Sequence, residues 1–71
     1  MIERTFQVEG SNQLTLRPRK FGLEGRTPAM PAGSWWLLGW ECVGNHLRRP
    51  DLPPVTREGF EWAMENRVAQ R

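Results

Sequence analysis

The side chains best suited to covalent chemistry in this 71-residue sequence are Cys42 and His46, which lie four residues apart. A thiol beside an imidazole can act as a nucleophile and its base. Such a pair needs a third group that orients the base and donors that stabilise an oxyanion, and no residue can be named for either role. We therefore interpret Cys42 as a small buried hydrophobe. We predict no catalytic residue and no enzymatic activity.

Metal and cofactor sites have equally little support. Cys42 is the only cysteine and His46 the only histidine, whereas a structural zinc ion takes four ligands of this kind. Gly22, Gly25 and Gly33 do not have the spacing of a phosphate-binding or dinucleotide-binding loop. The sequence therefore predicts no metal site and no cofactor.

Cations gather at two places, Arg17-Pro18-Arg19-Lys20 and Arg48-Arg49. Several such side chains together could neutralise phosphates and bind nucleic acid. The alternative is that charge on an edge strand prevents the strand from pairing with itself. We favour the alternative, because the net charge is only +2 and the chain carries eight acidic residues. A nucleic acid is therefore the second candidate partner.

Four tryptophans are more than a small core readily buries. We expect Trp36 and Trp40 to belong to the core, and Trp35 and Trp62 to be partly uncovered. Trp and Arg are enriched in the residues that dominate protein interfaces. The predicted partner-binding residues are Trp35, Trp62, Arg17, Arg19, Lys20, Arg48 and Arg49.

The N-terminal third is typical of a β-hairpin over residues 2–19. Residues 2–9 and 13–19 alternate between apolar and polar side chains, and Gly10, Ser11 and Asn12 between them favour a turn. Pro18 lacks an N–H, so the second strand should lie at an edge or end there.

Residues 20–34 contain three glycines and two prolines and are predicted to form a long loop. Phe21, Leu23 and Met30 should anchor this loop to the core. Loops of this length are often functional in small domains.

Residues 35–43, WWLLGWECV, form the most apolar run, and periodicity alone leaves its structure open. A central strand would place Trp36, Leu38, Trp40 and Cys42 on one face. A helix capped by Ser34 would align Leu37, Trp40, Gly44 and Leu47. The aromatic residues and the flanking glycines favour the strand.

Three prolines exclude helix from residues 44–54. A C-terminal helix follows over 57–69, with Thr56 as its cap and Phe60, Ala63, Met64 and Val68 as its apolar stripe. The sum is a single α+β domain over residues 1–71: a three-stranded antiparallel sheet made of hairpin 2–19 and central strand 35–43, with one helix packed on one face.

The chain should be cytoplasmic, because it has no apolar leader, no stretch near the ~20 residues of a membrane span and no possible internal disulfide. Nine of its ten cations are Arg, which suits a GC-rich bacterial gene. A short chain with an aromatic core and no catalytic constellation resembles the small accessory and inhibitor proteins of bacteriophages and other mobile elements. We therefore expect a protein-binding inhibitor or adaptor of a larger bacterial complex, with a homodimer as a further candidate assembly.

Overall fold

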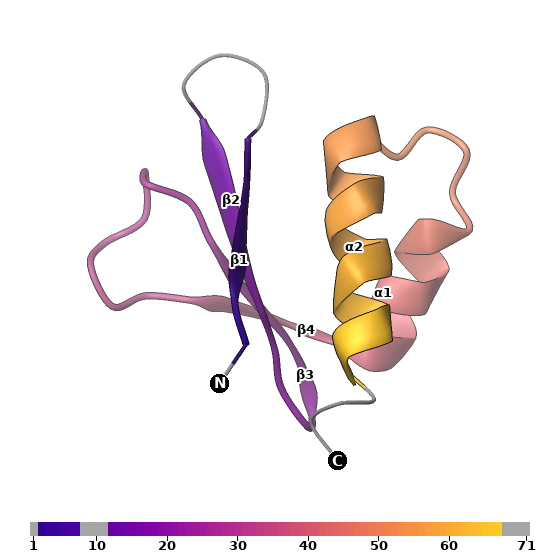
Figure 1. Ribbon diagram of the computed structural model, residues 1–71, viewed down its shortest axis with the longest axis horizontal. Coiled ribbons are helices and arrows are strands. Elements are labelled where there is room, and N and C mark those ends of the chain that lie inside the picture. Colours follow the sequence, from indigo (N-terminus) through magenta and orange to yellow (C-terminus); the bar gives the residue numbers. More distant parts are fainter. Residues whose placement is uncertain (1, 8–11, 68–71) are drawn as a thin grey trace.

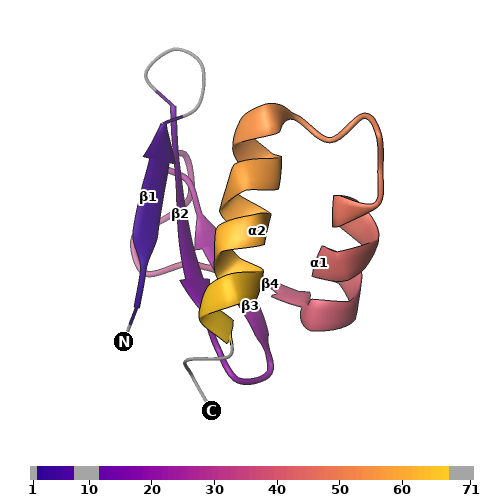
Figure 2. The ribbon, with the colours of Figure 1, turned by 45° about the vertical axis from the view of Figure 1, so that its right-hand side comes forward.

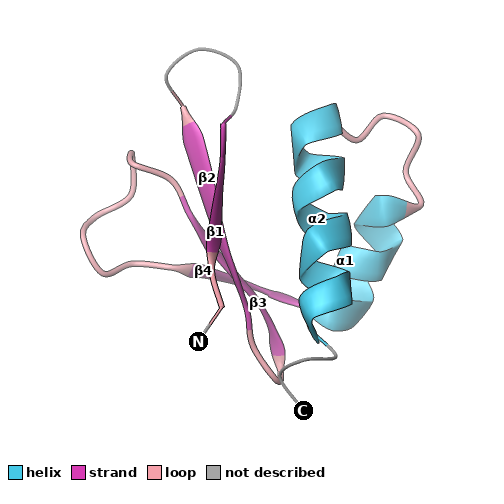
Figure 3. Ribbon diagram, viewed as in Figure 1, coloured by secondary structure: helices cyan, strands magenta, loops and turns pink. Residues whose placement is uncertain are grey.

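Four strands followed by two helices make up the chain. The computed structural model describes residues 2–7 and 12–67. The elements are β1 (Arg4–Gln7), β2 (Gln13–Pro18), β3 (Gly22–Arg26), β4 (Trp36–Gly39), α1 (Trp40–Leu47) and α2 (Pro54–Arg67). The strands form one antiparallel sheet in the order β1-β2-β3-β4 (Figures 1 and 3). The α+β prediction is confirmed, but the prediction of three strands and one helix is wrong.

The predicted N-terminal hairpin is present as β1 and β2, in which Phe6 lies opposite Leu14. Its predicted turn at 10–12 lies mostly outside the described residues. Pro18 ends β2, as one alternative had it, although β2 is an interior strand. The ladder of β1 starts where Arg4 faces Leu16. Pro18 lies beyond this start, so its missing N–H interrupts no β1 pair.

The prediction of a loop over residues 20–34 is wrong where β3 forms. Gly22 and Gly25 are not turn residues but places where β4 comes very close. A Cβ atom on Gly25 would overlap the indole ring of Trp36, and one on Gly22 would lie 2.8 Å from the carbonyl oxygen of Leu38. Glycine therefore serves strand packing here, whereas in the sequence it reads as a loop signal.

Among the three predicted loop anchors, Leu23 is fully buried in β3, so this anchor is confirmed. Met30 is half-buried. Phe21 is 62% exposed, and its prediction as a core anchor is wrong because it stands in the tight turn that joins β2 to β3.

The prediction of one central strand over residues 35–43 is also wrong, because the run divides between two elements. Its first half is β4, which lies at an edge of the sheet, and its second half opens α1. Gly39 separates them with an extended backbone (φ −62°, ψ 152°). Trp40 and Val43, three residues apart, are the buried residues of α1, as a helix requires. Cys42 is exposed rather than buried.

The C-terminal helix begins three residues earlier than predicted, and residues 68–69 of the predicted helix lie outside the described part. Thr56 is not its cap. Pro54 is the first helical residue, where the missing N–H of proline removes no helical hydrogen bond. The N–H of Arg57 donates to the carbonyl of Pro53 (2.9 Å).

Both helices cover the same face of the sheet, as Figure 2 shows from the side. α2 packs on β1 and β2, and α1 lies beside it against β3 and β4. The core between these two layers consists of Phe6, Leu16, Leu23, Trp40, Val43, Phe60 and Ala63. No described segment covers the other face of the sheet, which we call the open face.

α2 approaches the sheet closely because Gly59 has no side chain. A Cβ atom at this position would lie 2.7 Å from Cδ1 of Leu16. Leu16 is fully buried, so its side chain has no free space into which to move. Gly44 in α1 differs, because nothing lies within 4 Å of a Cβ atom placed there.

This difference predicts opposite effects for the same substitution. Gly44→Ala should raise the free energy of unfolding by about 0.5–1 kcal/mol, the helix propensity gain. Gly59→Ala should lower it by about 1–3 kcal/mol, because overpacking outweighs propensity. Urea unfolding of both variants measures the difference. A stabilised Gly59→Ala protein would show that α2 does not pack as closely as described.

Candidate protein-binding surface

The open face is built by the cross-strand register. Side chains alternate between the two faces along each strand, so the open face receives every second residue. One row crosses the sheet as Thr5, Thr15 and Arg26. The hydroxyl oxygens of Thr5 and Thr15 are hydrogen-bonded at 2.9 Å.

The neighbouring row consists of Arg17, Glu24 and Leu37. Trp36 lies opposite Gly25, so the same register places Trp35, just before β4, opposite Arg26. The two rows therefore bring the indole of Trp35 next to cations from both interior strands.

Two guanidinium groups hold the ring of Trp35. The guanidinium carbon of Arg17 lies 4.1 Å from the ring centroid and that of Arg26 lies 5.7 Å away. Each such cation–π contact contributes about 0.5–1 kcal/mol at an exposed site. Trp35 is thus fixed in orientation although it is only half-buried.

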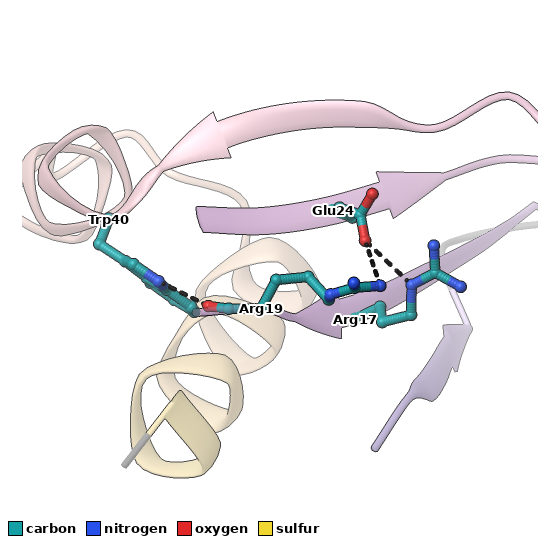
Figure 4. Close-up of polar contacts among 4 residues, drawn as sticks. All are labelled: Arg17, Arg19, Glu24 and Trp40. Carbon is teal, nitrogen blue, oxygen red and sulfur yellow. Dashed lines mark hydrogen bonds and ion pairs between the residues drawn. The ribbon is translucent and has the colours of Figure 1, made fainter. Parts of the chain in front are cut away.

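Glu24 links the two arginines of the predicted basic cluster (Figure 4). Its Oε1 accepts a hydrogen bond from Nε of Arg17 at 3.0 Å and from Nη1 of Arg19 at 3.2 Å. All three side chains are partly buried. One carboxylate therefore orders two cations, and it lowers the positive charge that this cluster presents.

Apolar surface lies next to this charged cluster. Leu37 is 56% exposed and Phe21 62% exposed, and they are the only large hydrophobic side chains classed as exposed in the described part of the chain. Cδ1 of Leu37 comes within 3.1 Å of the place where a Cβ on Gly22 would stand. Leu37 therefore lies over Gly22, directly beside the turn that carries Phe21.

The turn itself is anchored from the opposite layer. The carbonyl of Arg19 accepts a hydrogen bond of 2.9 Å from Nε1 of Trp40, the first residue of α1 (Figure 4). The N–H of Arg19 donates to the carbonyl of Gly22 at 2.8 Å. These two bonds hold the exposed residues Lys20 and Phe21 at one end of the open face.

The other end of the open face continues into a shallow hollow. Its volume is 270 Å³, and its lining residues are Gln13, Thr15, Arg26, Thr27 and Pro28. Arg26 borders this hollow and also contacts Trp35. The cation is therefore shared between the aromatic cluster and the hollow.

The structure brings together only part of the predicted partner-binding set. Arg17, Arg19, Lys20 and Trp35 gather on the open face and its turn. Trp62 belongs to the helical layer, where its ring packs edge-on against Phe6 with centroids 5.7 Å apart.

Arg48 and Arg49 follow the end of α1, away from the open face. Nη1 of Arg48 donates to the side-chain oxygen of Asn45 at 3.3 Å. Arg49 donates two hydrogen bonds to the Asp51 carboxylate, and these hold the pKa of that carboxyl below its usual value. The side-chain hydrogen bonds of Arg48 and Arg49 therefore go to α1 and to the residues that directly follow it.

Sequence reasoning missed Arg26, Leu37 and Phe21 as surface residues. Arg26 and Phe21 fell in the predicted loop, and Leu37 was placed in a central strand. Alternation over 22–26 would have identified Arg26, since Leu23 and Glu24 already face opposite sides.

Cys42 and His46 do not form the nucleophile–base pair that their spacing suggested. Nδ1 of His46 lies 2.8 Å from the backbone carbonyl oxygen of Cys42, not from its thiol. The imidazole also packs edge-on against Phe60 (centroids 5.9 Å apart). These contacts give His46 a structural role at the interface of the two helices.

Comparison with known proteins adds no identity. No protein-family model matches the chain, and searches of curated proteins and of solved structures return no match. Within residues 2–7 and 12–67, no helix is both long and apolar enough to cross a membrane. The candidate surface therefore rests on the geometry of the chain alone.

A pair of tryptophan substitutions separates surface from core. Trp40→Ala should cost about 3–5 kcal/mol of unfolding free energy, because its ring is almost fully buried. Trp35→Ala should cost only about 1–2 kcal/mol, the sum of its two cation–π contacts. Chemical denaturation measures both. Equal losses would place Trp35 in the core and remove it from the candidate surface.

Proposed function

We propose that this protein is a small binding module that holds a partner protein on the open face of its sheet. The observation that carries the proposal is the exposed Leu37 beside Trp35, whose ring is held by Arg17 and Arg26. Exposed apolar surface bordered by polar groups is typical of interaction sites. Ordered Trp and Arg side chains lose little conformational entropy when they bind, which favours their use as anchors.

The charge of this surface favours an acidic partner. Arg17, Arg19, Lys20 and Arg26 lie on the open face or its turn, and the described carboxylates on this side are Glu24 and, by alternation from Arg4, Glu3. Complementary charge speeds association and selects against wrong partners. We propose a partner segment that combines carboxylates with at least one apolar side chain for Leu37.

Nucleic acid is the second candidate, and the contacts on this face favour it less. The guanidinium carbon of Arg17 lies 4.1 Å from the ring centroid of Trp35, so Arg17 competes with a base for stacking on this ring. Arg17 and Arg19 already share a carboxylate, and Arg49 has its own in Asp51. Few cations are then left for the phosphate contacts that dominate such affinity.

The biological role that we propose is that of an inhibitor or adaptor, bacterial or phage-encoded, that acts on a larger bacterial complex in the cytoplasm. Three features support this role. The chain is short, Cys42 and His46 do not form a nucleophile–base pair, and Trp35 with its two arginines lies on the face of the sheet that the helices leave uncovered.

Affinity capture from a bacterial lysate with matched variants tests the surface. Arg26→Ala and Leu37→Asp should each weaken binding of a captured protein about tenfold or more, as expected for interface anchors. Arg48→Ala is the control, because it also removes an arginine, but one that lies away from the open face. It should change the affinity for the captured protein by less than about twofold. Circular dichroism verifies that all three variants fold.

Two results would contradict the proposal. In the first, the captured protein binds Arg26→Ala and Leu37→Asp as tightly as the wild type but no longer binds Arg48→Ala. The other is retardation of DNA or RNA at low salt that weakens steeply as salt rises, which would favour the nucleic-acid candidate.

A further inference from the structure

The outer edge of β4 carries backbone groups without described partners. In an antiparallel ladder, pairs that exchange hydrogen bonds alternate with pairs that do not. The bond from Arg19 N–H to the Gly22 carbonyl identifies these two residues as a hydrogen-bonded pair. The alternation then directs the backbone groups of Gly22, Glu24 and Arg26 toward β2, and those of Leu23 and Gly25 toward β4.

The same alternation fixes the direction of the β4 groups. Leu38 lies opposite Leu23 and Trp36 opposite Gly25, so Leu38 and Trp36 bond to β3. The N–H and C=O of Leu37 therefore point outward, away from the sheet. No described side chain or backbone group makes a hydrogen bond to them.

This edge also lacks three of the features that usually prevent strands from pairing. Exposed edges are commonly protected by charged residues, proline or bulges. Residues 36–39 read WLLG and contain none of these, whereas the other edge strand, β1, carries Arg4 in an ion pair with Glu58. β4 is the outermost strand on its side in Figure 4.

We propose that β4 pairs with β4 of a second copy of this chain, antiparallel and with Leu37 on the two-fold axis. Leu37 then exchanges both of its outward hydrogen bonds with Leu37 of the second copy. Trp36 lies opposite Leu38 of the second copy, and Trp35 lies opposite Gly39. This register places Leu37 against Leu37 and Trp36 against Leu38, and it uses the same segment of both copies, as an isologous interface requires.

Gly39 makes the register sterically possible. It is exposed, and nothing lies within 4 Å of a Cβ atom placed on it. An aromatic side chain across from a strand glycine can cover the glycine backbone. The space at Gly39 therefore accommodates Trp35 of the second copy.

Charge complements this arrangement. One end of the edge is basic, because Arg26 of β3 and Arg17 of β2 contact Trp35. The other end leads into Glu41, an exposed residue in the first turn of α1. Antiparallel pairing places the basic end of one copy next to the acidic end of the other. Face-to-face pairing of two open faces would instead oppose like charges.

A stable interface usually buries more than roughly 1,200 Å² of surface. Because β4 is short, we expect the paired edges to bury less than this, so the dimer should form only as the protein concentration rises. Sedimentation velocity on the full chain over a micromolar to millimolar range should show conversion from monomer to dimer. Leu37→Pro should weaken the dimer about tenfold or more relative to Leu37→Ala, because only proline removes the outward N–H. A monomer throughout the range would overturn the proposal, as would equal dimerisation of the two variants.

Cysteine cross-linking tests the register without relying on the proline variant. In a Cys42→Ser background, Leu37→Cys places two thiols across the two-fold axis at a Cα separation of about 5.5 Å, within the range of a disulfide. Mild oxidation should give a covalent dimer. Gly39→Cys is the control. In the proposed register position 39 faces Trp35 of the second copy, so the two introduced thiols lie far apart and this variant should form no covalent dimer.

Covalent dimer from Gly39→Cys in equal yield would overturn the register. These tests go beyond the proposed function and need no other protein. The dimer can therefore fail while the open face still binds a partner, and the reverse also holds.

Discussion

The position of Trp40 determines which face of the sheet is covered. Its indole is buried in the core, and its Nε1 donates to the carbonyl of Arg19 at the turn between β2 and β3. The bond is partly buried and joins the β2–β3 turn to the first residue of α1, so it fixes the point at which β4 becomes α1. The chain thereafter stays on one side of the sheet, and the guanidinium of Arg67 from α2 lies 5.1 Å above the same ring. The open face is a consequence of this junction.

A second arginine keeps the two helices together as a layer. The last carbonyls of a helix have no partner within the helix. Arg57 of α2 donates to the carbonyls of Leu47 (2.8 Å) and Arg49 (2.6 Å), at and just beyond the end of α1. The cation also lies where the helix dipole favours it. The proline-containing connection between the helices therefore needs few contacts of its own. The two helices are bonded to each other, whereas no described segment covers the open face.

The elements that the sequence predicted correctly are those whose pattern has one physical cause. Alternation in residues 2–19 reflects burial on one face only, and the stripe containing Phe60 and Ala63 reflects one helical face. The wrong predictions involve residue types that can have two different physical causes. Gly22 and Gly25 are glycines because Leu38 and Trp36 approach them, not because the chain turns, and a sequence contains no record of such an approach. The candidate surface was predicted in part for the same reason. Arg17 lay in a recognisable strand and Trp35 in a conspicuous apolar run, whereas Arg26 lay in the predicted loop.

Adjacent tryptophans illustrate how little sequence distance separates core from surface. Trp36 lies over Gly25 on the helix-covered face, and Trp35, one residue earlier, lies between arginines on the open face. A shift of one residue in the β3–β4 register would exchange them, which would expose the ring that packs on Gly25 and bury the ring that Arg17 holds. Trp40 opposes that shift, because moving β4 by one residue along β3 would take its indole N–H away from the carbonyl of Arg19. The residue that fixes the core therefore also fixes the surface that we propose for binding.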